Sequence, residues 1–239
     1  MIDPYLDREY QRFAEELILV NQYPQEDLAS IIKEVGFLCN CCGGCCVAGQ
    51  NGHVFLLDQD TDHAQIICPD ALIPAPFFEA CDKEGNFYVS GYALRTNADG
   101  SCIHLSDKKC KIYQERFSIC RIYPYMLHRE PDEKGRLVFR QISGLNEHGE
   151  YHALISSEES DRIARETIEY ERAWLIQMIQ FFEELRDLFA KNQQRHVRKI
   201  YDNAMKEFQK GKPVKVFVFH NRQFTPVMVS IQDYEGILE

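Results

Sequence analysis

The sequence predicts an α+β fold in which a small, irregular cysteine-rich metal domain with a β-hairpin is flanked by helices. Three observations indicate it: helical periodicity near the N-terminus, a dense group of cysteines followed by short alternating runs, and a long amphipathic stretch near the C-terminus. At 239 residues the chain can bury a sizeable core. We expect a cysteine-cluster metal-binding domain with N-terminal helices over 1–150, and a helical region ending in two short strands over 151–239.

Two helices are predicted before the first cysteine. Pro4 to Leu19 places aromatic and aliphatic residues at helical spacing, which is typical of an amphipathic helix. A second helix is expected from Gln25 to Val35, again with its apolar side chains on one face. It leads the chain to Cys39.

The segment after the cysteine group predicts a short strand at His53 to Leu57. The aspartates of 58–62 alternate as in a calcium loop, but the loop's sixth and twelfth positions hold His63 and Pro69 instead of Gly and Glu. We therefore expect an aspartate to cap a helix that runs through Ile66.

Aromatic and polar residues alternate from Asn86 to Leu94, which predicts an exposed strand, and Asn97 to Gly100 predicts a turn. A hairpin is expected further on, with arms at Tyr123 to Arg129 and Arg136 to Ile142 and a turn at Pro131 to Gly135.

The composition changes at Ser156, where Ser156 to Glu159 has the pattern of a helix capping box. A long amphipathic helix should follow. Its predicted apolar anchors are Ile163, Ile168, Trp174, Ile176, Ile179, Phe182, Leu185 and Phe189.

Lys191 to Gln194 predicts a break in that helix, and a second helix should end at Gln209, before a Gly and a Pro. Two strands should close the chain, Val214 to His220 and Thr225 to Ile231, joined by residues 221–223.

The formal net charge of −10 argues against a nucleic-acid-binding protein, because phosphate affinity depends on clustered Lys and Arg. No apolar run is long enough to span a bilayer, and the N-terminal residues lack a signal-peptide hydrophobic core. We therefore expect a cytoplasmic protein without a membrane segment. In a reducing compartment, dense cysteines indicate metal or redox chemistry rather than disulfides.

Five of the ten cysteines lie between Cys39 and Cys46. Cys39, Cys42 and Cys45 have the C-x2-C-x2-C spacing that wraps a ferredoxin-type cluster, and Gly43-Gly44 lets the backbone turn closely around it. Cys46 follows Cys45 directly, so it would serve a second centre, bridge, or lie beside the ligands.

A zinc site is the main alternative, because scattered single ligands can also bind zinc. Cys102, Cys110 and Cys120 do not form the second C-x2-C knuckle of a typical zinc site, so the spacing favours iron–sulfur. Isolated Cys68 and Cys81 are expected to pack as small apolar residues.

Several other polar residues lie near the cysteines in sequence. His53 and His104 are expected to be structural or surface residues rather than ligands. Arg121, next to Cys120, either stabilises a thiolate-rich centre or forms an ordinary salt bridge. No catalytic residue can be identified.

The motif order resembles the YkgJ-type cysteine-cluster family, the zinc- or iron-chelating proteins with a CxxCxxCC signature. The likeness rests on Cys39-x2-Cys42-x2-Cys45-Cys46 and on three later pieces, Cys102-Ile-His-Leu, Cys110-Lys-Ile-Tyr and Cys120-Arg-Ile-Tyr-Pro. Two departures are an extra thiol at Cys41 and Arg116-Phe117 where the family often has Arg-Pro.

The resemblance implies a metal-chelating domain whose members are often labelled iron–sulfur oxidoreductases. It points to seven ligand candidates: Cys39, Cys42, Cys45, Cys46, Cys102, Cys110 and Cys120. A flagellin lysine methylase has a similar cysteine arrangement, so a protein-modifying role is a further alternative.

Two hypotheses follow for the function. The first is an iron–sulfur protein, most simply with a [4Fe–4S] cluster, that transfers electrons or catalyses an oxidoreductase reaction. The second is a zinc- or iron-binding protein whose metal serves structure or interaction. In either case we expect self-association or a protein partner to use the C-terminal helices, because their apolar stripe is costly to leave in water.

Overall fold

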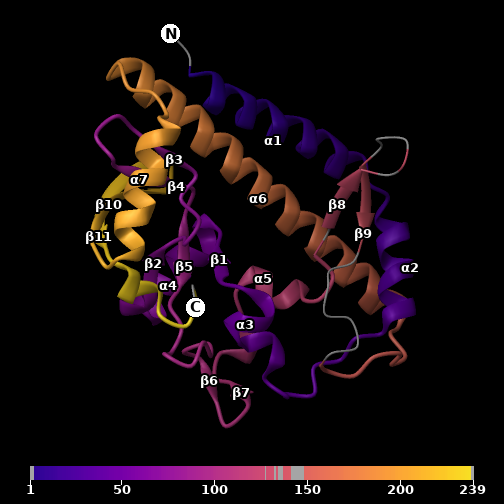
Figure 1. Ribbon diagram of the computed structural model, residues 1–239. Helices are drawn as coiled ribbons and strands as arrows, with labels where there is room; N and C mark the ends of the chain where they lie inside the picture. Colours follow the sequence, from indigo (N-terminus) through magenta and orange to yellow (C-terminus); the bar gives the residue numbers. More distant parts are fainter. Residues whose placement is uncertain (1–2, 127, 132, 134–136, 141–147, 238–239) are drawn as a thin grey trace.

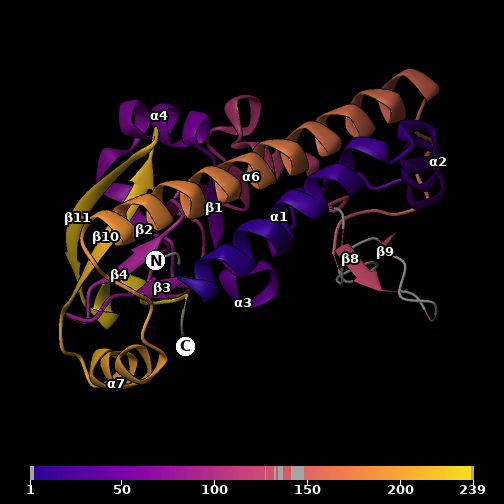
Figure 2. The same cartoon turned by 90° about the horizontal axis from the view of Figure 1, so that it is seen from above.

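The computed structural model describes residues 3–126, 128–131, 133, 137–140 and 148–237. The fold is α+β, as predicted. Its longest element is helix α6 (Ser157–Lys191), which crosses the molecule with α1 (Pro4–Gln22) alongside it (Figure 1). Helix α2 (Gln25–Val35) packs near the beginning of α6, and strands gather near its end (Figure 2).

Local chemistry explains where the N-terminal helices begin and end. Asp3 caps α1, because its side chain accepts hydrogen bonds from the amides of Tyr5 (2.9 Å) and Leu6 (3.2 Å). The helix extends three residues beyond the predicted Leu19. The bounds predicted for α2 are confirmed, and Gly36 ends it with a left-handed φ of 55°.

The predicted long amphipathic helix is confirmed as α6. Ser156 caps it by accepting a hydrogen bond from the Glu159 amide at 3.1 Å. Most predicted anchors are buried or half-buried against α1, α2 and the strands, and Trp174 lies edge-on to Phe13. Ile176 is the exception: it was predicted as an anchor and is 43% exposed, because its position on the helix faces solvent.

The larger sheet has the strand order β11-β10-β4-β3. Strand β10 (Val214–His220) pairs in parallel with β4 (Phe87–Val89) and antiparallel with β11 (Gln223–Val229). Strand β3 (Ala80–Cys81) completes the other edge. The predicted start of the last strand at Thr225 is two residues late, because Asn221 and Arg222 alone make the turn, both with positive φ.

The smaller sheet has the order β1-β5-β2, made of β1 (Val54–Leu56), β5 (Tyr92–Leu94) and β2 (Leu72–Pro74). The prediction of one exposed strand over Asn86 to Leu94 is wrong. The segment divides at Ser90 and Gly91 between the two sheets, and nearly all of it is buried. The aromatic side chains find apolar neighbours on both sides, which alternation alone does not reveal.

Short elements complete the fold. The helices are α3 (Ala48–Asn51), α4 (Asp58–Ile67), α5 (Ser118–Ile122), α7 (Arg198–Gln209) and the 3-10 turns η1 (Gly44–Cys46), η2 (Pro69–Ala71), η3 (Tyr113–Glu115) and η4 (Ile231–Tyr234). The strands are β6 (Leu105–Ser106), β7 (Lys109–Cys110), β8 (His128–Pro131) and β9 (Leu137–Arg140).

Two predictions about these short elements change. The aspartate cap of α4 is wrong, because Leu57 is its N-cap and makes no side-chain hydrogen bond. The hairpin near residue 130 is confirmed as β8 and β9, but its first arm begins at His128 and includes Pro131. Residues 127, 132, 134–136 and 141–142 of that prediction lie outside the described residues.

Elements from both sides of residue 150 are interleaved. Strand β10 pairs with β4, and α6 packs against α1 and α2. The division into 1–150 and 151–239 therefore stays a prediction about folding units. In the described part of the chain, no helix is both long and apolar enough to cross a membrane.

Glu79 gives the fold a pH dependence. Its carboxylate accepts hydrogen bonds from the hydroxyl (2.5 Å) and the amide of Ser90, and burial raises the pKa of Glu79 to about 7. The folded chain keeps a proton that the unfolded chain releases above its usual pKa near 4.5, so stability falls as the pH rises to about 7. We expect Glu79→Gln to remove a loss of about 2–3 kcal/mol over this window, measured by urea unfolding.

Glu84→Gln is the control for this experiment, since Glu84 is exposed near the same strands. It should unfold with the wild-type dependence on pH. An unchanged slope in Glu79→Gln would show that Glu79 is ionised throughout.

Candidate metal centre

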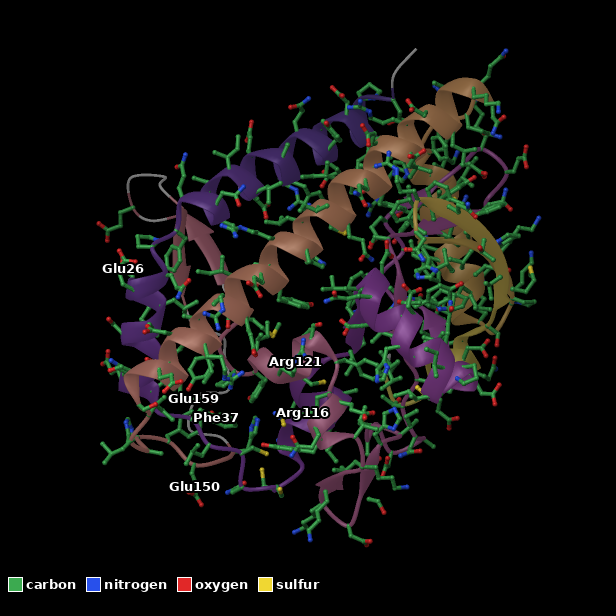
Figure 3. The ribbon with its side chains drawn as sticks, turned by 180° about the vertical axis from the view of Figure 1, so that it is seen from behind. Glu26, Phe37, Arg116, Arg121, Glu150 and Glu159 are labelled. Carbon is green, nitrogen blue, oxygen red and sulfur yellow. The ribbon has the colours of Figure 1, made fainter. Side chains whose placement is uncertain are left out.

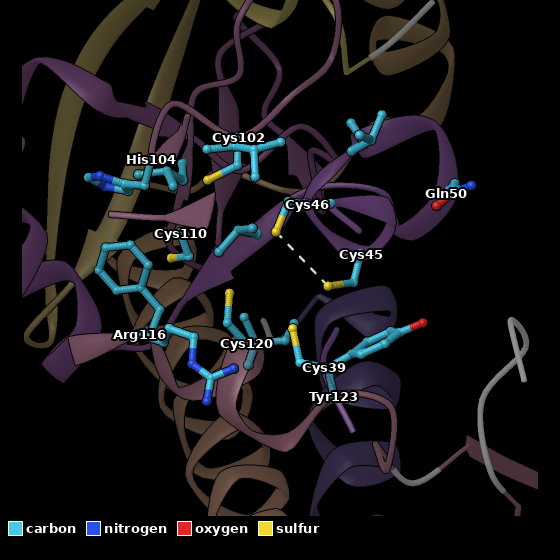
Figure 4. Close-up of a pocket in the computed structure, with 18 of the residues that line it drawn as sticks. Cys39, Cys45, Cys46, Gln50, Cys102, His104, Cys110, Arg116, Cys120 and Tyr123 are labelled. Carbon is cyan, nitrogen blue, oxygen red and sulfur yellow. Dashed lines mark hydrogen bonds between the residues drawn. The ribbon is translucent and has the colours of Figure 1, made fainter. Parts of the chain in front are cut away.

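Eight cysteines line one cavity of about 360 Å³ (Figure 4). They include all seven ligand candidates together with the extra thiol of Cys41. Cys68 and Cys81 do not line it. The structure thus brings the predicted site residues together from four segments of the chain, and their role as metal ligands stays a prediction.

The first cysteine segment is a short loop built around Gly43. This residue has a φ of 81° and precedes turn η1, where the Cys46 amide donates to the Gly43 carbonyl at 3.0 Å. A side chain at a positive φ is strained, which is why glycine suits this position. The loop thereby presents Cys45 and Cys46 to the cavity.

A backbone hydrogen bond joins the first and second cysteine segments. The amide of Cys102 donates to the carbonyl of Cys46 at 2.8 Å, and Val47 and Ser101 form an isolated β-bridge beside it. The two segments are more than fifty residues apart in sequence, so this bridge assembles the cavity wall.

The third and fourth segments are placed by a tight hairpin and a short helix. Strands β6 and β7 turn at Asp107 and Lys108, both with positive φ, and carry Cys110. Helix α5 carries Cys120. Its beginning is fixed because the Asp60 carboxylate accepts hydrogen bonds from the Ser118 amide (3.0 Å) and hydroxyl (2.9 Å).

The sulfur atoms share a cavity but are not drawn together. The Sγ atoms of Cys45 and Cys46 are 4.0 Å apart. Within the described residues, no group of three or more Cys, His, Asp or Glu side chains is close enough to hold a metal ion. Cys39, Cys41 and Cys42 are exposed, and the other five lining thiols are half-buried. The donors fit a thiolate-bound metal chemically, and binding would have to bring them closer.

Burial holds most of these thiols in their protonated form. It raises the pKa of Cys102 to about 11 and also raises the pKa values of Cys39, Cys110 and Cys120. Cys45 is different, because the hydrogen bond from the Cys46 thiol lowers its pKa. A metal entering the cavity must therefore displace protons, and Cys45 yields its proton more readily than the thiols whose pKa values are raised.

Three histidines line the cavity, including one that the sequence did not indicate. His148 Nε2 lies 2.6 Å from the Tyr123 hydroxyl, and the two rings are stacked. The ring also packs directly on Gly44, because an added Cβ there would lie 2.8 Å from His148 Cγ. His53 and His104 were expected to be structural, and both line the cavity too.

The imidazoles of the cavity wall are potential nitrogen donors. Burial lowers the pKa of His53 to about 4, which keeps its ring neutral. His104 Nε2 and His148 Nδ1 are buried atoms without a hydrogen-bond partner. His148 could be found only from the tertiary structure, since no cysteine lies near it in sequence.

The positive charge expected near the cysteines comes from a different residue. Arg121 is exposed and does not line the cavity, whereas Arg116 does. In Figure 3 both are labelled around α5, and Figure 4 places Arg116 below Cys110 and beside Cys120. Arg116 lies between Cys110 and Cys120 in sequence but next to neither, so the sequence did not single it out.

A comparison with family models matches residues 38–142, somewhat less than half of the chain, to the family CxxCxxCC, described as "Putative zinc- or iron-chelating domain". No curated protein and no solved structure matches the chain significantly. The matched residues include all eight cavity thiols.

Gly43 should be sensitive to substitution. Gly43→Ala places a side chain at a φ of 81°, so we expect the free energy of unfolding to drop by about 1–2 kcal/mol. Gly43→Asn should lose less, because asparagine tolerates this conformation better. Chemical denaturation of the metal-loaded protein measures both.

Gly49→Ala is the matched control in the neighbouring helix α3. An added Cβ there meets nothing within 4 Å, so no loss is expected. Equal losses at Gly43 and Gly49 would contradict the special role of the Gly43 turn.

Proposed function

We propose that the cysteine cavity binds an iron–sulfur centre and serves electron transfer or an oxidoreductase reaction. The match of residues 38–142 to the model of a zinc- or iron-chelating domain supports metal binding. The cytoplasm is the compartment that fits this proposal, because it keeps thiols reduced. All ten cysteines are free in the structure.

The donor set carries the proposal. The cavity presents eight thiols, and among its described lining residues there is no Asp or Glu. Thiolates select iron–sulfur clusters, zinc and Cu(I), whereas magnesium, calcium and manganese prefer carboxylates. Within this set, the C-x2-C-x2-C spacing of Cys39, Cys42 and Cys45 favours an iron–sulfur cluster.

The ligand assignment follows the spacing. Cys39, Cys42 and Cys45 would bind three irons of a [4Fe–4S] cluster, and one of Cys102, Cys110 or Cys120 would supply the fourth thiolate. The remaining thiols, including Cys46, lie beside the centre. When bound, such a cluster supplies one-electron transfer.

The exposed cysteines of the first cysteine segment are consistent with electron transfer to or from a partner. A structural metal site is closed by its ligands and surroundings, but Cys39, Cys41 and Cys42 are exposed. An electron donor or acceptor could therefore approach this edge. A partner or second copy at the C-terminal helices is the other part of the proposal. On α6 it would contact Ile176, the exposed member of the predicted stripe.

A zinc-binding protein with a structural or interaction role is the second candidate. The buried, unpartnered ring nitrogens of His104 and His148 favour it. Zinc commonly takes mixed sulfur and nitrogen donors, whereas [4Fe–4S] clusters usually take four thiolates.

Anaerobic purification separates the two candidates. We expect brown protein with broad absorbance near ~400 nm, and iron and acid-labile sulfide in equal amounts. Colourless protein with stoichiometric zinc, which iron and sulfide do not displace on reconstitution, would establish the zinc function instead.

Cysteine substitutions test the shared site. Cys42→Ser should abolish or strongly reduce the metal content, because a serine hydroxyl is a poor ligand for a soft metal. The same loss is expected in one of Cys102→Ser, Cys110→Ser and Cys120→Ser, namely the variant that removes the fourth thiolate. Elemental analysis of the purified variants measures it. Cys68→Ser is the control and should keep the wild-type content, since Cys68 does not line the cavity. Retention of full metal by all three of the latter variants would contradict the shared site.

A further inference from the structure

The charges around the cavity are the reverse of the chain's average. The sequence has 37 acidic and 27 basic residues. The cavity nevertheless has three cationic side chains, Arg95, Lys108 and Arg116, and no carboxylate among its described lining residues. A cavity wall with the average composition of the chain would carry more acidic than basic side chains, so this wall differs from the average.

Arg116 is the cation among the three that is both held in place and unneutralised. Arg95 pairs with Asp233 at 3.6 Å, and Lys108 is exposed at the hairpin turn. In the described residues Arg116 has no carboxylate partner within 4 Å. Its charge is therefore available to the cavity.

Tyr113 fixes the position of the Arg116 side chain. Arg116 Nε donates to the Tyr113 carbonyl at 2.9 Å, and the guanidinium carbon lies 3.9 Å from the centre of the Tyr113 ring. This cation–π contact occupies one face of the guanidinium and leaves both terminal nitrogens free to face other groups. Figure 4 shows the guanidinium beside Cys39 and Cys120.

The charge lies near thiols from several segments. Arg116 lines the same cavity as Cys39, Cys110 and Cys120, and Figure 4 shows it below Cys110 and beside Cys120. These cysteines come from the first loop, the β6–β7 hairpin and α5. Arg116 is therefore close to the point where the segments converge.

We propose that Arg116 is a positioning residue that compensates the negative charge of a thiolate-bound metal centre in this cavity. The inference rests on the proposed metal-binding function but not on which metal is bound. Four thiolates around a divalent ion carry a net charge of about −2. A fixed guanidinium next to them, in a wall without carboxylates, stabilises that charge more than flexible surface cations could.

Arg121 provides a matched control. It follows Cys120 directly in sequence, yet it is exposed and lies outside the cavity wall. Its charge instead acts on the buried carboxyl of Asp60, where it opposes the rise in pKa that burial causes. Removing either arginine changes the net charge of the protein equally, so only the position of the charge differs.

The test compares the zinc affinity of the full chain with that of Arg116→Gln, Arg116→Lys and Arg121→Gln. Competition with a chromophoric chelator under reducing, anaerobic conditions gives the dissociation constants. We expect Arg116→Gln to bind zinc roughly 10–100-fold more weakly, which is the usual cost of losing a group that supports metal ligands. Arg116→Lys should stay within a few-fold of wild type, and Arg121→Gln should equal it.

The outcomes separate this inference from the proposed function. If the wild type binds neither zinc nor a reconstituted cluster, the metal function itself is wrong. If the wild type binds zinc and Arg116→Gln binds it equally well, only the role of Arg116 is wrong. A loss in Arg116→Lys as large as in Arg116→Gln would overturn charge compensation too, because the charge is kept there.

A check of folding and a second readout keep the proposal testable if Arg116→Gln does not fold. If circular dichroism shows that Arg116→Gln is unfolded, Arg116→Met replaces it, since its side chain can still pack on the Tyr113 ring. In protein reconstituted with iron and sulfide, the neutral variant should have a more negative reduction potential, because the reduced centre carries more negative charge. An unchanged potential would contradict the proposal.

Discussion

The placement of the cysteine cavity depends on one buried side chain of α6. Gln177 is 4% exposed, and its amide accepts a hydrogen bond from the Asp58 amide and donates one to the Ser90 carbonyl, both at 2.9 Å. It thus fixes the beginning of α4 and the break between β4 and β5 to the same helix. From α4, Asp60 holds the beginning of α5, which carries Cys120. The wall of the cysteine cavity is therefore anchored to α6.

The sequence was informative where local periodicity decides the structure. The bounds of α2 and the end of α7 at Gln209 were predicted, because cap residues and apolar spacing are local signals. The break at Ser90 was not, because it depends on Gln177, a residue 87 positions away. The parallel pairing of β10 with β4 is hidden for the same reason. Cysteine spacing indicated the site, whereas Arg116 and His148 reach it only through the fold.

In this cavity, protonation of the thiols and the binding of a metal compete with each other. Burial raises the pKa values of most cavity thiols, so a metal that binds here must displace protons. Metal–thiolate bonds can offset that cost and draw the exposed Cys39–Cys46 loop inward. The loop is suited to such closure, because its conformation depends on a glycine turn and few packed side chains. A bound metal would then bring the thiols of this loop closer to those of the other three segments.

The net negative charge of the protein works against a negatively charged metal centre in this cavity. A chain with a net charge of −10 would oppose a centre that is itself negative. Keeping carboxylates out of the wall removes the nearest repulsion, and the guanidinium of Arg116, held on Tyr113, adds a local attraction. By the proposal above, this arrangement would favour a thiolate-bound metal of either kind, zinc or iron. Only a redox-active centre gains a second benefit, because a fixed cation stabilises the reduced state more than the oxidised state. The same arginine would then both retain the metal and make its reduction easier.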